Sequence, residues 1–186
     1  MLIPYFSEIF QKPEPEFAKI PCQGDIFRKE MLKLDVINPE SISGWMIINT
    51  TCDFAAKKLD FFCFVPIRPL VYYLEKNIDL KKGELKQNLD TIIRNNTFKT
   101  FFLPATPLFD EQNDHYCELQ YIFSVGVGIN FEKTCEKMLS FRITSLKSPW
   151  REKLGHLLDN NFSRVGIPEP KAGYKNARDK MISQVI

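Results

Sequence analysis

Hydrophobic residues are most concentrated in two short runs, residues 45–48 and 61–67, which enclose a polar segment. Both runs are rich in β-branched and aromatic residues and are too short for buried helices, so each predicts a core strand. The polar segment between them contains Thr50, Thr51 and Asp53. We expect Asp53 to cap a helical turn that covers residues 54–58 in this connection.

Further strands are expected on both sides of this pair. After Gly24 and Asp25, a hydrophobic run predicts a strand from residue 26 to about residue 34, before a turn at Asn38 and Pro39. Later β-rich runs predict three more strands, at residues 98–104, 116–127 and 141–146. We expect one strongly bent antiparallel sheet to contain the strands at about residues 25–33, 45–50, 61–67, 98–103 and 117–126.

Two stretches have the residue spacing of helices instead. Between residues 71 and 96, apolar residues recur three or four positions apart, which predicts helices that are broken near Lys82 and Gly83. A further helix is predicted over residues 149–165, with Ser148 as its N-cap and Pro149 at its first position.

This order of elements indicates the α+β class, as a small, strongly bent antiparallel β-barrel decorated with helices. We expect a single barrel domain over residues 23–168, with a helical insert at 71–96 and a C-terminal helix at 149–165. Residues 1–22 contain four prolines and predict a leader that lies along the surface. Residues 169–186 predict a loosely held tail.

The composition agrees with one domain that has a well-filled core. The chain has 186 residues, of which 44% are hydrophobic and 16 are Phe. This size and aromatic content exclude a disordered or fibrous chain. No apolar run approaches the roughly 18–20 residues that a membrane span needs, and the start lacks the order of a signal peptide. We therefore expect a cytoplasmic protein that does not bind a membrane.

The five cysteines predict neither a metal site nor a disulfide framework, because no two of them have CxxC spacing. We expect reduced thiols, no metal and no small-molecule cofactor. Cys52 beside Asp53 is the most reactive-looking pair, since a helix N-terminus and nearby lysines lower the pKa of a thiol. The interpretation that we favour is structural: Cys52 packs, and Asp53 caps backbone amides.

Charge is distributed unevenly along the chain. The net charge is +2, but residues 142–186 carry nine Lys and Arg against four acidic residues, which leaves −3 for the rest. Arg151 and Arg164 lie on or near the predicted C-terminal helix in this basic end. Both are candidates for binding a partner or an RNA backbone, and the alternative is a helix whose charges are solvated.

Three short motifs resemble the MazF/PemK-like family of SH3-like barrels, which is best known for toxin ribonucleases. The family has a Gly-Asp pair before its first strand, as Gly24 and Asp25 here. Its strands of the form VLVISN and VAPI are similar to residues 45–49 (WMIIN) and 64–67 (FVPI). The resemblance covers residues 24–70. It implies an SH3-like barrel that is closer to uncharacterised bacterial relatives accompanying toxin–antitoxin or phage-defence genes.

The chain departs from this family at the toxin's catalytic positions. Ser43 and Gly44 stand where the toxins have an Arg-Pro pair, at the entrance to the second strand. Arg68 stands where they have a threonine. The resemblance therefore implies a relative without a complete toxin ribonuclease site.

The expected binding site is one end of the barrel, where we expect the ends of the two central strands to meet. Four residues are expected to line it: Thr50, Thr51, Asp53 and Arg68. The Arg68 guanidinium would bind a phosphate or a carboxylate there, and small barrels bind nucleic acid on such surfaces. In the alternative, the threonines satisfy turn hydrogen bonds and Arg68 forms an exposed ion pair with Asp53.

These patterns predict a nucleic-acid- or partner-binding module of a bacterial toxin–antitoxin or phage-defence system. The expected ligand is a protein partner in such a complex, and RNA or DNA is also possible. Two alternatives stay open. One is an active endoribonuclease with relocated catalytic residues, for which Arg68, Thr51 and Asp53 are the candidates. The other is an accessory subunit that bridges larger proteins of a defence complex.

Overall fold

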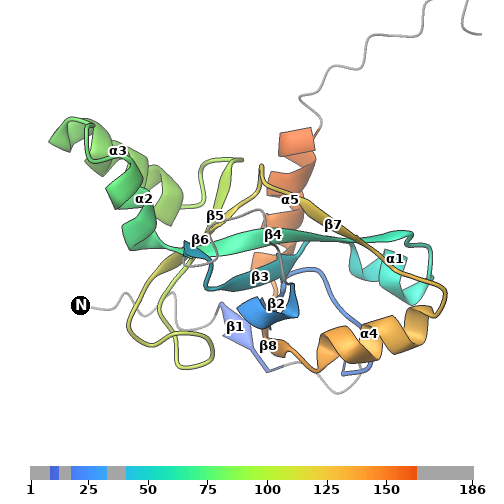
Figure 1. The fold of residues 1–186 in the computed structure, drawn as a ribbon. Coiled ribbons are helices and arrows are strands. Elements are labelled where there is room, and N and C mark those ends of the chain that lie inside the picture. Colours follow the sequence, from blue (N-terminus) through green and yellow to red (C-terminus); the bar gives the residue numbers. More distant parts are fainter. Residues whose placement is uncertain (1–8, 13–17, 33–40, 163–186) are drawn as a thin grey trace, which may run out of the picture.

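In the described part of the chain, eight strands form one antiparallel sheet that curls into a half-barrel (Figure 1). The computed structural model describes residues 9–12, 18–32 and 41–162. The strand order is β1-β8-β2-β3-β4-β6-β5, and β7 also pairs with β4. The strands are β1 (Phe10–Gln11), β2 (Asp25–Arg28), β3 (Gly44–Ile47), β4 (Phe61–Pro69), β5 (Thr100–Leu103), β6 (His115–Glu118), β7 (Phe123–Gly126) and β8 (Arg142–Leu146).

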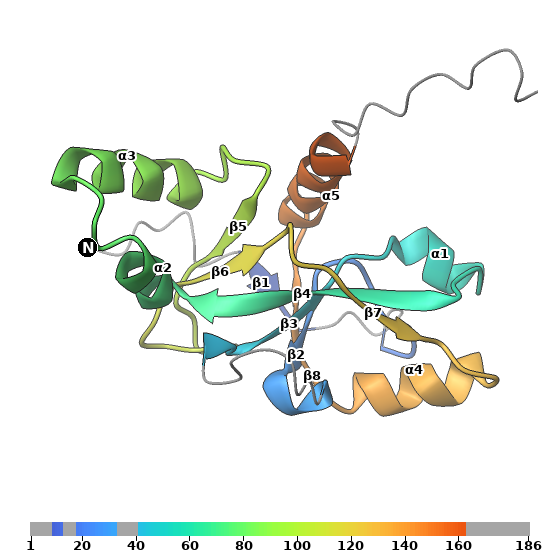
Figure 2. The same cartoon turned by 45° about the horizontal axis from the view of Figure 1, so that its top comes forward.

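Five α-helices and one 3-10 turn lie between or after these strands in the described residues. They are η3 (Lys29–Met31), α1 (Thr51–Ala55), α2 (Leu70–Lys76), α3 (Lys82–Ile93), α4 (Phe131–Leu139) and α5 (Trp150–Phe162). The helices α2 and α3 project from one end of the sheet, and α1 and α4 lie towards its opposite end (Figure 2). None of the helices in the described ranges is long and apolar enough to cross a membrane.

Alternation of side chains along the central strands gives the sheet two buried faces. On β3, Met46 lies in one hydrophobic cluster, whereas Trp45 and Ile47 lie in the other. On β4, Val65 packs with the first cluster and Phe64 with the second. The helix α5 covers the first face, and α1 and α4 cover the second. A smaller cluster lies where α2 and α3 meet β5 and β6.

The single bent antiparallel sheet confirms the expected fold class, although several elements end elsewhere. β2 stops at Arg28 and a 3-10 turn follows, so the strand expected to about residue 34 is shorter. The strand expected at 116–127 is two strands, β6 and β7, which both pair with β4. The helices expected between residues 71 and 96 are α2 and α3.

Three further elements differ from the sequence pattern. β1 brings residues 10–11 of the expected leader into the sheet, where Phe10 is buried. The helix α4 was not expected at all. The helix α5 begins at Trp150, after a cis peptide between Ser148 and Pro149, so the expected first position at Pro149 is wrong. The expected tail at 169–186 lies outside the described residues.

A buried ion pair joins β2 to β8. Asp25 is fully buried and accepts hydrogen bonds from the Arg142 guanidinium and from the Cys22 amide, each at 2.9 Å. The Ser145 hydroxyl donates to the other carboxylate oxygen. Burial raises the pKa of Asp25, and the hydrogen bonds from Ser145 and Arg142 oppose that rise. The carboxylate of the Gly-Asp motif therefore has a structural role in joining β2 to β8.

Replacing Asp25 with Ala should lower the free energy of unfolding by about 3–5 kcal/mol, because the largely buried Arg142 loses its carboxylate. Urea denaturation followed by circular dichroism measures the change. Asp60→Ala is the control, since the side chain of Asp60 is exposed, and it should change stability by no more than about 0.5 kcal/mol. Equal effects of the two substitutions would contradict a structural role for the cluster.

Candidate functional site

The connection between β3 and β4 uses its polar residues to form a short helix. Thr50 is the N-cap of α1: its hydroxyl oxygen accepts from the Asp53 amide at 3.2 Å, and the hydroxyl donates to the Asp53 carboxylate at 2.7 Å. The Thr51 hydroxyl oxygen accepts from the Gln23 amide at 3.2 Å. The expected capping residue, Asp53, is therefore inside the helix, and the threonines make turn hydrogen bonds.

Arg68 lies at the opposite end of β4 from this connection. β3 begins at Gly44, which pairs with the residue just before Arg68. A strand rises about 3.3 Å per residue, so Arg68 is roughly 20 Å from the start of β4. The prediction that placed it in one site with Thr50, Thr51 and Asp53 is wrong.

The Arg68 guanidinium is buried and is held by neighbouring groups of the protein. The residue is only 6% exposed. Its Nε donates to the Glu118 carboxylate on β6, and its Nη1 donates to the Ser41 hydroxyl. The Tyr72 ring on α2 lies 4.9 Å from the guanidinium carbon. The ion-pair partner is thus Glu118 and not Asp53, and the group joins β4, β6 and α2.

His115 lies at the same end of the sheet, at the start of β6. Its Nε2 is 3.1 Å from the Ser43 hydroxyl and 3.6 Å from the Asp110 carboxylate. Burial lowers the pKa of His115, and Asp110 opposes this effect. A serine beside a neutral histidine resembles a nucleophile and its base. However, the carboxylate approaches the same ring nitrogen as the hydroxyl, so the orienting arrangement of a catalytic triad is missing.

The remaining predicted residues do not form a common site. Arg151 is half-buried on α5 and donates to the Leu146 carbonyl at 3.0 Å. Arg164 lies outside the described residues. Cys52 is exposed, which corrects the expectation that it packs. In the ranges that the structure describes, no group of three or more His, Cys, Asp or Glu side chains is able to hold a metal ion.

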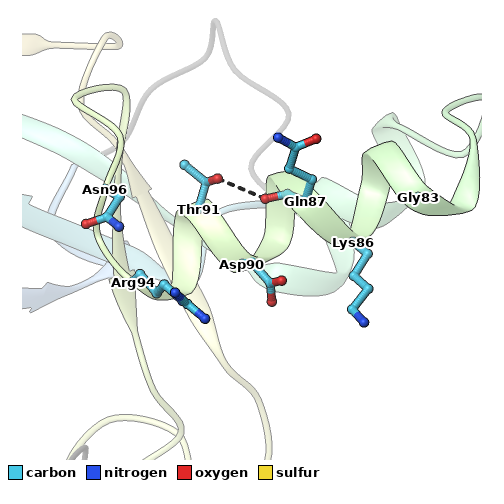
Figure 3. Close-up of a pocket in the computed structure, with 7 residues that line it drawn as sticks. All are labelled: Gly83, Lys86, Gln87, Asp90, Thr91, Arg94 and Asn96. Carbon is cyan, nitrogen blue, oxygen red and sulfur yellow. Dashed lines mark hydrogen bonds between the residues drawn. The ribbon is translucent and has the colours of Figure 1, made fainter.

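An open groove of about 340 Å³ runs along α3 (Figure 3). Lys86, Asp90 and Arg94 follow one another at four-residue intervals, so cations and an anion alternate along the helix. The Thr91 hydroxyl donates to the Gln87 carbonyl at 2.8 Å. Alternating charge of this kind is typical of a solvated helix face, and we assign no ligand to the groove.

The outer edge of β7 is open. Cys63 on β4 pairs with Ser124, and its carbonyl accepts a hydrogen bond at 3.0 Å from the residue after β3. The backbone of Cys63 therefore faces β3 and not β7. Alternation in an antiparallel ladder then turns the backbones of Phe123 and Val125 towards β4, and those of Ser124 and Gly126 outwards.

The outward groups on β7 are exposed, whereas a side chain covers part of the β5 edge. Ser124 and Gly126 are both exposed, and no described residue bonds to their outward N–H and C=O groups. On β5, the Asn95 side chain accepts a hydrogen bond from the Phe102 amide at 2.7 Å and covers that edge. β1 has only two residues. β7 contains neither the Lys nor the Pro that commonly protects an edge strand.

An apolar pocket of about 160 Å³ lies behind β7, between β4 and α4. Phe62 and Phe64 contribute its wall on β4, and Met138 contributes its wall on α4. Val125, which is 36% exposed, lines it from β7. Lys137 is the only charged residue of the lining and forms no ion pair with a described residue. We define the β7 site as the open β7 edge together with this pocket.

No protein-family model matches the chain, and no curated protein matches it in sequence. The choice of site therefore rests on its geometry.

The sequence pattern did not predict the β7 site, because one strand was expected over both β6 and β7 and no element was expected at α4. A helix was nevertheless visible in the sequence. Phe131, Cys135 and Met138 recur at helical spacing, and all three pack on the sheet. Asn130 is the N-cap, since its side chain accepts from the Lys133 amide at 2.9 Å.

Replacing Arg68 with Ala should lower the free energy of unfolding by about 3 kcal/mol, since Glu118 would remain largely buried without its cation. Arg94→Ala, at the exposed C-cap of α3, is the control and should cost no more than about 0.5 kcal/mol. Thermal and urea unfolding measure both. An unchanged melting temperature for Arg68→Ala would show that Arg68 is a surface residue after all.

The two histidines should differ in their effect on stability as the pH falls. Because the pKa of His115 is lowered in the folded protein, the unfolded chain takes up the proton first. Stability should therefore be lost as the pH falls below about 6.5, the ordinary pKa of histidine. His115→Gln should reduce this loss between pH 7 and pH 5, whereas His156→Gln, at an exposed position, should not. Identical pH profiles of the free energy of unfolding for both variants would exclude this role of His115.

Proposed function

We propose that the protein is a partner-binding module whose partner is another polypeptide that adds a strand to the open edge of β7. The observation that carries the proposal is the row of exposed backbone groups on Ser124 and Gly126. No described residue forms a hydrogen bond with these groups. Such a row is a template for strand addition, in which main-chain hydrogen bonds supply affinity and adjacent pockets supply specificity.

The positions of the cations favour a polypeptide over a nucleic acid. Binding of nucleic acid depends mainly on cations that contact phosphates. Arg68 and Arg151, the described candidates for that role, donate hydrogen bonds to groups of the protein itself. Along α3 and its C-cap, Asp90 lies between Lys86 and Arg94. The β7 site offers neutral backbone groups and apolar surface instead, which suit an extended peptide.

The curled antiparallel half-barrel supports a distant relationship to the MazF/PemK-like barrels. On this proposal the protein works in the bacterial cytoplasm, as an accessory subunit of a toxin–antitoxin or phage-defence complex. The endoribonuclease alternative has less support, because Thr51 and Asp53 are on α1, at the opposite end of β4 from Arg68.

Photo-cross-linking from two matched glycines tests the proposal. A Cβ added at Gly126 or at Gly83 on α3 would have no atom within 4 Å, so a benzoylphenylalanine fits at either position. In cells of the native host, we expect protein adducts from position 126 and few from position 83. Ser124→Pro removes one outward N–H, keeps the bonds of Phe123 and Val125 to β4, and should abolish the adducts. Ser124→Thr keeps that N–H and should preserve them.

Circular dichroism and the melting temperature confirm that the Ser124 variants are folded. Adducts that nuclease removes would indicate a nucleic acid and contradict the proposal. Adducts that form equally from position 83, or that survive Ser124→Pro, would show that the β7 edge is not the interface.

A further inference from the structure

We infer that the partner strand inserts one ring-sized apolar side chain into the pocket behind β7 and places a carboxylate beside Lys137. This inference rests on the proposed function, because it specifies which kind of segment pairs with β7. The partner class is an extended segment with a Phe- or Leu-sized anchor and a neighbouring Asp or Glu.

The position of the pocket relative to the edge supports the first step. Side chains that lie directly opposite each other in a strand pair are on the same face of the sheet. Val125 lies opposite Phe62, and both line the pocket. A residue of an added strand opposite Val125 would lie on that same face, about 4.8 Å further out. Its side chain is therefore the one that reaches the pocket.

The size and lining of the pocket define the anchor. The volume is about 160 Å³, and the walls are formed mainly by apolar side chains: Phe62 and Phe64 of β4, Val125 of β7 and Met138 of α4, together with Met31, Leu32 and Phe141. Apolar cavities of about 150 Å³ stay dry and accept a benzene-sized ring. One aromatic or branched aliphatic side chain fits such a space, and burial of a single anchor of this kind often dominates the affinity of an interface.

The charge at the pocket defines the neighbour of the anchor. Lys137 is exposed, lines the pocket, and has no ion pair with a described residue. Glu132, on the same helix, is already paired with Lys57 of the β3–β4 connection. A partner carboxylate beside the anchor would complement Lys137, and such a rim charge selects among partners more than it adds affinity.

Two small probes examine the pocket separately from the strand edge. 3-Phenylpropionate carries a ring and a carboxylate, and 3-phenylpropanol carries the same ring without charge. NMR titration of the full chain should show that both bind and that both shift the signals of Val125 and Met138. Ser124→Pro should leave both affinities unchanged, because the pocket does not use the outward N–H.

Variants at the pocket should then separate the apolar and the charged contributions. Val125→Phe fills the rim with the protein's own ring and should weaken both probes at least about tenfold. Lys137→Gln should weaken only 3-phenylpropionate, about two- to fivefold. Lys133→Gln is the control, one turn earlier on α4 and outside the pocket lining, and should weaken neither.

The same variants test the assignment to the partner. Val125→Phe should lower the yield of adducts from position 126 at least about tenfold. If neither probe binds while position 126 still forms adducts, the inference is overturned and strand addition at β7 stands. Undiminished adducts in a Val125→Phe variant that no longer binds the probes also overturn the inference. The absence of any adduct from position 126 overturns the proposed function itself, whatever the probes do.

Discussion

The structure depends on the way in which one strand is shared among three partners. β4 has nine residues. β3 pairs with one of its edges, whereas β7 takes the first half of the other edge and β6 takes the second half. Because β6 and β7 occupy successive halves, the chain must turn between them. β5 then extends the sheet beyond β6 but not beyond β7. The open edge of β7 is a direct consequence of this division.

Two buried ion pairs hold the strands of this divided sheet in register. Asp25 with Arg142 joins β2 to β8, and Arg68 with Glu118 joins β4 to β6. Each pair connects two neighbouring strands that are far apart in the sequence. Buried charges of this kind contribute less to net stability than their geometry suggests, and their removal one partner at a time is costly. The most deeply buried charged groups of the described chain therefore serve the fold, and the proposed site consists mainly of backbone and apolar groups.

The fold class follows from local sequence pattern, whereas the site depends on pairing between distant segments. The runs around Trp45 and Phe64 are short and rich in β-branched and aromatic residues, which is why strands could be predicted there. Arg68 was expected beside the connection between β3 and β4, but only the strand residues next to that connection lie near the connection. Arg68 is at the far end of β4. Its partner Glu118 belongs to a strand that lies beside β4 only in the folded chain, and no local pattern contains that information. The β7 edge could not be predicted for the same reason. Whether one side of a strand is open depends on whether another strand pairs with that side in the folded chain.

Amide hydrogen exchange along β7 measures directly whether the outer edge of this strand is open. Amides whose hydrogen bonds join β7 to β4 should exchange slowly, and outward amides should exchange at close to the rate of an unstructured peptide. An open β7 edge predicts alternation in the isolated protein: slow exchange at Phe123 and Val125, and fast exchange at Ser124 and Gly126. Equal, strong protection of all four amides would show that the outer edge of β7 is already covered and is not available for a partner strand.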